Sequence, residues 1–291
     1  MCLAVTEAFA GSDVSGIRTT AELTEDGQHF LVSGTKKWIT NGVFCDYFVV
    51  ACKTAKGFSV LLVPRSDAVE TKLIKTSYST AAGTTYIQFD NAKVPVKNML
   101  GKEGQGFQVV MSNFNHVCSR PFSSHSARKK KLTNRQQERW MMCGAVIRWI
   151  RLVTEECLKW SHQRIVFGKP LISQPVIRAK LAKMIALTES TQAWLEQITH
   201  QMNNMTYAQQ SKLLSGPIAL LKSHSTRCAH DVADDATNIF GGRGITRGGM
   251  GRVVEMFHRG YKFDAILGGT EEILADLGVR QAMKVMPKAR L

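Results

Sequence analysis

The sequence lacks several features that would assign it to a class at once. No apolar run approaches the roughly 20 residues that a membrane-spanning helix needs. The N-terminus does not resemble a signal peptide, because the acidic residues Glu7 and Asp13 interrupt it. Seven cysteines are scattered along 291 residues without a Cys-x-x-Cys pair. This spacing argues against a disulfide framework and a zinc site, and favours a reducing compartment.

Acidic residues are scarce relative to basic ones: 23 Asp and Glu stand against 38 Lys and Arg, a net charge of +15. Such an excess first suggests a polyanionic partner. Part of the excess is local, since six basic residues and no acidic residue lie in the segment 117–137. These six are Arg120, Arg128, Lys129, Lys130, Lys131 and Arg135.

The first hundred residues have the pattern of short strands separated by Gly, Asp, Asn and Pro. Runs at 18–23 and 29–33 flank the turn Glu25-Asp26-Gly27, which predicts a hairpin. We therefore expect a small antiparallel β domain over residues 1–100. Its further strands are expected at 47–52, 58–63, 71–74 and 85–89.

Beyond the glycines at 101, 104 and 106 the apolar period becomes helical. Apolar residues between 176 and 202 recur at steps near three and four, as one buried helix face requires. The predicted fold class is therefore α+β, the β domain being followed by a C-terminal helical bundle over 101–291. Other helices are expected from 107, over 140–161, over 211–238 and over 270–285.

Three separated segments carry a family resemblance. Residues 3–13 read Leu-Ala-Val-Thr-Glu-Ala-Phe-Ala-Gly-Ser-Asp, 34–42 read Gly-Thr-Lys-Lys-Trp-Ile-Thr-Asn-Gly, and 267–273 read Leu-Gly-Gly-Thr-Glu-Glu-Ile. In order and spacing they resemble the signature segments of the acyl-CoA dehydrogenase family of FAD-dependent flavoproteins. The resemblance implies an oxidoreductase of fatty acid metabolism (β-oxidation) that converts a saturated acyl-CoA thioester to the 2,3-enoyl-CoA.

The resemblance also implies an FAD site on the β domain. Val5 and Thr6 would bond the pyrimidine edge of the flavin ring, and Ser12 would meet the FAD phosphates and the CoA side. Trp38 would pack against the ring, and Thr40 would bond near its reactive nitrogen. Fixed donors at the ring edge would stabilise a flavin that accepts hydride. The alternative is that Trp38 is a core aromatic and both threonines merely suit strands.

A second FAD-binding segment is implied at residues 164–174. Here Arg164 would pair with the pyrophosphate of a neighbouring subunit's FAD, Phe167 would pack, and Gln174 would bond the far end of the cofactor. Gln174 lies one residue closer to Phe167 than is usual in the family. The alternative for Arg164 is an ordinary helix-end cation.

Further cofactor residues are implied near the C-terminus. Asn238, Gly241 and Gly242 resemble an FAD-contacting turn, with Asn238 where many members carry Gln, and Thr270 and Glu272 would complete the flavin site. The glycines follow a predicted helix rather than a strand, so they fail the context of a Rossmann fingerprint. A flavin bound here would not lie in a Rossmann domain.

The catalytic base is expected on a helix. Many family members carry their glutamate directly before the Gly-Thr of the last motif, where this chain has Gly268, which cannot take a proton. A second branch, including the isovaleryl and long-chain enzymes, carries it on an earlier helix before an arginine. Glu138 and Arg139 fit that position if 117–137 is removed. We expect Glu138 to take the α-proton, the Gly268 N–H to polarise the thioester carbonyl, and Arg139 and Asn115 to contact the substrate. The alternative for Glu138 is a solvated helix glutamate.

The segment 117–137 has no counterpart in the family, and its Ser-rich, basic composition predicts disorder. Valine codons begin with GT, glutamine can be CAG, and Leu132-Thr133 can be encoded as CTAAC, which together resemble the signals of a short intron. We hypothesise a retained intron or a gene-model error. The alternative is a genuine basic loop that binds CoA phosphates, nucleic acid or a membrane surface.

Partners and location are implied in the same way. The electrons would pass to an electron-transfer flavoprotein, or to oxygen in an oxidase of the same fold, and the family usually forms homotetramers. Family members carry a helical domain before the first motif, so we expect this chain to be a fragment. The alternative from another class is a catalytically impaired or nucleic-acid-binding relative.

The C-terminal tripeptide Ala289-Arg290-Leu291 resembles the peroxisomal address whose best-known form is Ser-Lys-Leu. It predicts a peroxisomal location, with the mitochondrion as the alternative. The alternative is that these residues are a basic helix end, whose positive charge interacts favourably with the helix dipole, and that they carry no targeting signal.

We predict that the mature transcript passes from the codon of His116 directly to that of Glu138. Sequencing the transcript across this junction checks the prediction. A mature message that keeps the codons of 117–137 would contradict it and favour the basic loop.

Overall fold

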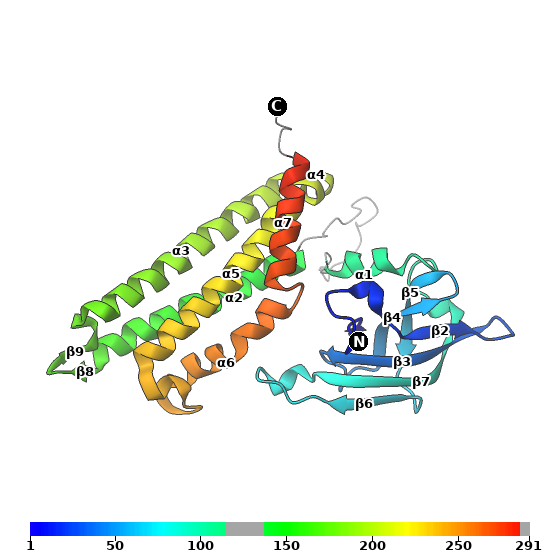
Figure 1. The fold of residues 1–291 in the computed structure, drawn as a ribbon, viewed down its shortest axis with the longest axis horizontal. Coiled ribbons are helices and arrows are strands. Elements are labelled where there is room, and N and C mark those ends of the chain that lie inside the picture. Colours follow the sequence, from blue (N-terminus) through cyan, green and yellow to red (C-terminus); the bar gives the residue numbers. More distant parts are fainter. Residues whose placement is uncertain (115–136, 286–291) are drawn as a thin grey trace, which may run out of the picture. The chain divides into compact units, whose positions relative to one another are not determined.

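The computed structural model describes residues 1–114 and 137–285. The chain divides into two compact units, Met1–Asn113 and Phe114–Leu291 (Figure 1). Three features of the sequence analysis lie outside the described residues: Asn115, the segment 117–136, and the C-terminal tripeptide 289–291.

Seven strands of the first unit form one sheet with the hydrogen-bonded order β1-β4-β2-β3-β7-β6, and β5 pairs with β4 (Figure 1). The strands are β1 (Cys2–Ala4), β2 (Thr20–Leu23), β3 (His29–Ile39), β4 (Tyr47–Thr54), β5 (Gly57–Pro64), β6 (Val69–Leu73) and β7 (Thr85–Pro95).

The predicted hairpin joins β2 to β3, and its Gly27 has φ +65°, a conformation that glycine adopts without steric cost. The antiparallel arrangement holds for β2–β3, β3–β7, β4–β5 and β6–β7. The sheet is nevertheless mixed, because β1 and β2 each pair with β4 in parallel. These pairings join strands that are not consecutive in the sequence, so the alternation within each strand could not reveal them.

The sheet buries one apolar face, where Phe48 and Phe89 meet edge to face with ring centroids 5.9 Å apart. Helix α1 (Gly106–Phe114) belongs to this unit. A Cβ on Gly106 would lie 2.6 Å from Ser59 Cα, so only glycine permits this approach to β5. The sequence pattern divides the chain near residue 100, whereas the structural division follows Asn113 because α1 packs on the sheet.

A buried ion pair fixes the segment after β1 to strand β3. Lys36 Nζ lies 2.8 Å from Glu7 Oε1, both side chains are at most 5% exposed, and Lys36 also donates to Val5 O at 3.0 Å. Glu7 accepts further hydrogen bonds from the Arg18 N–H, the Thr19 N–H and the Thr19 hydroxyl. Burial alone would raise the pKa of Glu7, but these donors, Lys36 foremost, hold it below its ordinary value. Burial lowers the pKa of Lys36.

The second unit is a helical bundle built around α5 (Ser215–Phe240), which packs against the five other α-helices described in this unit (Figure 1). Buried alanines at 219, 229, 233 and 236 let these helices approach α5 closely. The other elements are α2 (Gln137–Gln163), β8 (Ile165–Val166), β9 (Lys169–Pro170), α3 (Pro175–Asn204), α4 (Tyr207–Leu213), α6 (Arg252–Ile266) and α7 (Glu271–Val285). The predicted α+β fold, with its helical bundle after the β domain, is confirmed.

Two details of the helix prediction are corrected. The helix expected over 211–238 is two helices, since α4 ends at Leu213 and α5 begins at Ser215. On α3, Leu181, Met184 and Ile198 are buried as predicted, whereas Val176 and Ile185 are exposed. The apolar period therefore marks more residues than this unit alone buries.

Helix α6 was not predicted, because charged residues and Gly260 interrupt its apolar residues. A signal was present nonetheless. Val254, Phe257, Tyr261 and Ala265 recur at steps of three and four, and all four are buried.

Within the described ranges, the six cysteines are all buried free thiols, and no three His, Cys, Asp or Glu side chains gather as metal ligands would. None of the described helices is both long and apolar enough to cross a membrane.

Replacing one partner of the buried pair should destabilise the β unit strongly. We expect Lys36→Met to lower the free energy of unfolding by about 3–5 kcal/mol, because Glu7 is then buried without its counter-charge. Urea unfolding followed by circular dichroism measures this, with the half-buried neighbour Lys37→Met as the control.

Lys36→Met combined with Glu7→Gln should recover part of the loss, since no uncompensated charge remains. A Lys36→Met loss below about 1 kcal/mol, the size of an exposed ion pair, would contradict the assigned role.

Candidate functional site

The turn between α6 and α7 contains two glycines in succession. Gly268 has φ +69° and Gly269 has φ +115°, and Gly268 is buried. Both angles lie in a region that side chains other than glycine rarely adopt. The Gly-Gly pair of the last motif therefore permits an abrupt turn between the two helices.

The first turn of α2 packs on this turn. Arg139 Nε donates to Gly268 O at 3.0 Å, and a Cβ on Gly268 would lie 3.0 Å from Met142 Sδ. Residues four apart share one face of a helix. Glu138 therefore lies on the Met142 face of α2, toward Gly268. The structure thus brings together Glu138, Arg139 and Gly268, which are far apart in the sequence.

The Glu138 carboxyl differs from that of a solvated helix glutamate in its burial and in its hydrogen bonding. Its Oε2 is buried without a hydrogen-bond partner among the described residues. Burial raises the pKa of Glu138 above its ordinary value, and the Arg139 guanidinium offsets part of this rise. A carboxylate with a raised pKa and a free oxygen suits a proton acceptor.

Gly268 itself has no room for a base. A side chain at this position would take a strained left-handed backbone and would displace the Met142 thioether. The packing of α2 on the turn therefore fits a glutamate on the helix rather than one at 268.

Thr270 and Glu272 lie at the start of α7. Thr270 O accepts the Leu274 N–H at 3.0 Å, which begins the helix. Glu272 is exposed, and the hydrogen bonds of its own backbone N–H and of Thr270 hold its pKa below the usual range. Its neighbour Glu271 has a buried Oε1 without a partner in the described part of the chain, and its Oε2 lies 3.8 Å from Arg227.

A buried lysine that the sequence analysis missed also reaches the turn. Lys222 of α5 is 1% exposed, and its Nζ donates to Ala265 O at 3.1 Å and to Gly269 O at 2.8 Å. A single lysine inside an amphipathic helix gives no sequence signal, because most such lysines are solvated.

Arg164, Phe167 and Gln174 lie beyond the other end of α2. Phe167 is at the tip of the β8–β9 hairpin with φ +50° and is 93% exposed. Arg164 is exposed as well, and the half-buried Gln174 directly precedes α3. The hairpin thus presents an aromatic ring and a cation to the surroundings of this unit.

Asn238, Gly241 and Gly242 lie where α5 ends and a short 3-10 helix (Gly241–Ile245) begins. Asn238 Nδ2 donates to Asp234 O at 2.9 Å. A Cβ on either glycine would meet nothing within 4 Å, so the backbone there is open.

This turn and the β8–β9 hairpin lie at the same end of the bundle. Trp160, near the end of α2, stacks on Phe240 at 5.3 Å, and the Arg243 guanidinium lies 5.0 Å from the Trp160 ring. Helix α2 has 27 residues, so its two ends are about 40 Å apart at 1.5 Å per residue. Within this unit the structure therefore does not bring the β8–β9 hairpin, or the turn after α5, close to Glu138.

In the β unit the two motif segments lie side by side. The Lys37 N–H donates to Thr6 O at 2.9 Å, and Val5 is buried. Trp38 has φ +61° at an irregularity of β3 and is 49% exposed, so it is not a core aromatic of this unit. Thr40 is exposed directly after β3, and Ser12 is exposed near the end of the first motif.

Two family models match the chain. The acyl-CoA dehydrogenase middle domain matches residues 2–92, and the acyl-CoA dehydrogenase C-terminal domain matches residues 132–283. The first match covers nearly all of the sheet, and the second covers nearly all of the helical bundle.

Curated relatives agree with the models. An acyl-CoA dehydrogenase of Emericella nidulans is 37% identical over 290 residues, covering 98% of this chain and 61% of the relative. One of Alternaria alternata is 33% identical over 296 residues, covering 99% of this chain and 63% of the relative. The chain therefore spans about three fifths of the length of these relatives.

Solved structures have the same fold. A putative acyl-CoA dehydrogenase from Mycobacterium smegmatis superposes with a TM-score of 0.81 at 26% identity, covering 98% of this chain and 68% of that chain. An acyl-CoA dehydrogenase from Geobacillus kaustophilus has a TM-score of 0.81 at 27% identity, covering 97% and 68%. With one family model on each structural unit, the chain belongs to the acyl-CoA dehydrogenase family.

Proposed function

We propose that this protein is an FAD-dependent dehydrogenase that converts a saturated acyl-CoA thioester to the 2,3-enoyl-CoA, with Glu138 as the base. The observation that carries the proposal is the buried Glu138 oxygen, which has no hydrogen-bond partner among residues 1–114 and 137–285, on the face of α2 that packs against the Gly268 turn. FAD, when bound, supplies the acceptor for the hydride of the β-carbon.

The chain's own residues supply the acid–base chemistry. Glu138 takes the α-proton, for which its raised pKa gives suitable basicity. The Gly268 N–H donates to the thioester oxygen and stabilises the enolate character that develops there. Arg139 holds the turn through its bond to Gly268 O. Ser12 and Asn115 stay predicted substrate contacts.

The exposed residues fit FAD by their chemistry. Trp38 is 49% exposed, and Thr40, which carries a hydroxyl, follows directly after β3. Arg164 is an exposed guanidinium, the group best suited to pair with a pyrophosphate. The open backbone at Gly241 and Gly242 leaves space for a cofactor to approach.

The separation of the two groups along α2 supports an assembly of several chains. Arg164 and Glu138 are near opposite ends of a 27-residue helix, and Phe167 is almost fully exposed. We propose that the β8–β9 hairpin meets the cofactor of a neighbouring subunit in a homotetramer. An electron-transfer flavoprotein, or oxygen, would then reoxidise the flavin.

Glu138→Gln should retain FAD yet lose its anaerobic reduction by acyl-CoA, because an amide cannot accept the α-proton. We expect the reduction rate to fall by about 10²–10⁴-fold. Stopped-flow bleaching of the flavin, in protein made from the mature transcript and loaded with FAD, measures the rate. Glu155→Gln, a half-exposed glutamate of the same helix with no role in the proposed site, is the matched control.

The unaltered protein should also show an acid limb in this rate, with reduction growing faster as pH rises through the raised pKa of Glu138. Near-normal reduction in Glu138→Gln, or a requirement for Glu271 instead, would remove Glu138 from the mechanism.

Trp38→Ala should weaken FAD binding by about tenfold and shift the flavin absorbance, because a ring contact is lost. Tyr47→Ala is the control, since Tyr47 is an aromatic of the same unit with 46% exposure against 49% for Trp38. Equilibrium dialysis and the visible spectrum decide the outcome. Equal FAD affinity and spectrum in both variants would show that Trp38 does not contact the cofactor.

A further inference from the structure

Lys222 is buried, and the described parts of the chain place no carboxylate in an ion pair with it, an arrangement that is rare for lysine. Its side chain is 1% exposed, and among the described residues no acidic oxygen lies within ion-pair distance of its Nζ. Its two acceptors are backbone carbonyls, those of Ala265 and Gly269. The ammonium therefore donates its hydrogen bonds to the backbone at the end of α6 and in the turn that follows it.

The two carbonyls flank the Leu267–Gly268 peptide. Ala265 lies in the last turn of α6, where carbonyls have no partner within the helix and the helix dipole favours a cation. Gly269 lies beyond Gly268, and neither glycine has a side chain to restrict its backbone. The Lys222 ammonium thus restricts the backbone conformation of this turn, which the two glycines would otherwise leave free to vary.

A second cation completes this arrangement. Arg139 of α2 donates to Gly268 O at 3.0 Å, so the carbonyls of residues 265, 268 and 269 are each held by a cationic side chain. Lys222 and Arg139 come from different helices of the bundle. The turn is therefore fixed to both α5 and α2.

We propose that Lys222 is a positioning residue, which holds the Leu267–Gly268 peptide in the direction that lets the Gly268 N–H polarise the acyl-CoA thioester carbonyl. The inference rests on the function proposed above, because it assigns a purpose to the same turn. In this role Lys222 contacts neither the substrate nor the cofactor, and it acts only through its hydrogen bonds to the backbone.

The charge of Lys222 supports a role other than stability. Burial lowers its pKa to about 8 from 10.5, and the groups that act on it are Cys143 and Arg139 of α2, Asp264 of α6 and Glu271 of α7. Between these two pH values the unfolded state binds more protons than the folded state, so stability rises with pH there. Below pH 8 the buried ammonium costs stability. A residue that served only to stabilise the bundle would not need this charge.

Lys222→Met keeps the length of the side chain and removes its donors. In the FAD-loaded protein at pH 7, we expect amide hydrogen exchange across residues 266–272 to become about tenfold faster, while the melting temperature does not fall. We expect kcat for acyl-CoA to fall by about 10–10³-fold with little change in KM, because carbonyl polarisation acts mainly in the transition state.

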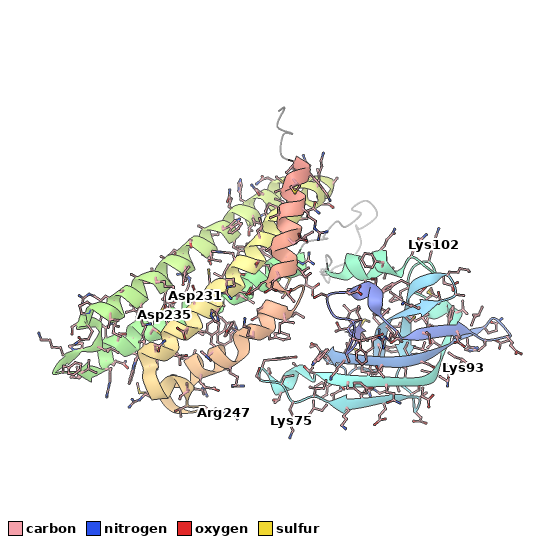
Figure 2. All side chains as sticks on the ribbon, viewed as in Figure 1. Lys75, Lys93, Lys102, Asp231, Asp235 and Arg247 are labelled. Atoms are coloured by element: carbon pink, nitrogen blue, oxygen red, sulfur yellow. The ribbon has the colours of Figure 1, made fainter. Side chains whose placement is uncertain are left out.

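The matched control is Lys183→Met on α3. Lys183 is half-exposed and lies 3.4 Å from Asp231 and 3.3 Å from Asp235, two acidic residues of α5 shown in Figure 2. It should leave the exchange of 266–272 and kcat unchanged.

A second test measures amide hydrogen exchange of the unaltered protein at a series of pH values. Protection of 266–272, corrected for the intrinsic effect of pH, should fall as pH rises through about 8, since a neutral amine donates weaker hydrogen bonds. Constant protection through this range, or a Lys222→Met protein with normal exchange and normal kcat, would overturn the proposal. If acyl-CoA does not reduce the flavin of the unaltered protein, the proposed function is wrong, whereas the exchange comparison still decides whether Lys222 orders the turn.

Discussion

The candidate site depends on the hydrogen bond from Arg139 Nε to Gly268 O. This bond fastens the first turn of α2 to the turn between α6 and α7, two segments far apart in the sequence. It places Met142 against Gly268 and so directs the Glu138 face of the helix toward the same turn. The guanidinium is also the charge that moderates the rise in the Glu138 pKa. Position and basicity of the carboxyl thus share one cause.

Buried cations recur in both units, and each is bonded to backbone that carries a motif. Lys36 donates to Val5 O and pairs with Glu7, which holds the first motif against the strand that contains Trp38. Lys222 donates to Ala265 O and Gly269 O around the last motif. Buried charges contribute little net stability compared with well-packed apolar side chains. Their common location favours a role in holding glycine-rich and irregular backbone in one conformation.

Much of the fold could be predicted from residue pattern. The β2–β3 hairpin follows from Asp26-Gly27, and the helical bundle follows from apolar steps of three and four. Parallel pairing of β1 and β2 with β4 could not be predicted, because it depends on where distant strands meet. Helix α6 was not predicted, because charged residues and Gly260 stand between the buried Val254, Phe257 and Tyr261.

The site residues were named from motif resemblance, while their environment came only from the structure. The sequence contains no sign that Glu138 has a buried oxygen with no partner in the described part of the chain, or that Lys222 is inaccessible to solvent. Both properties arise from packing between α2, α5 and the 267–270 turn. The distance between Glu138 and Arg164 likewise became known only from the structure, which shows that α2 is one continuous helix of 27 residues between them.

The most direct test of the central claim is a structure of the protein with FAD and a non-reacting acyl-CoA analogue. The account predicts a Glu138 carboxyl oxygen about 3–3.5 Å from the α-carbon, on the side of the proton that is removed. It also predicts that the thioester oxygen accepts the Gly268 N–H. A different carboxylate facing the α-carbon, with Glu138 turned away from the ligand, would contradict it.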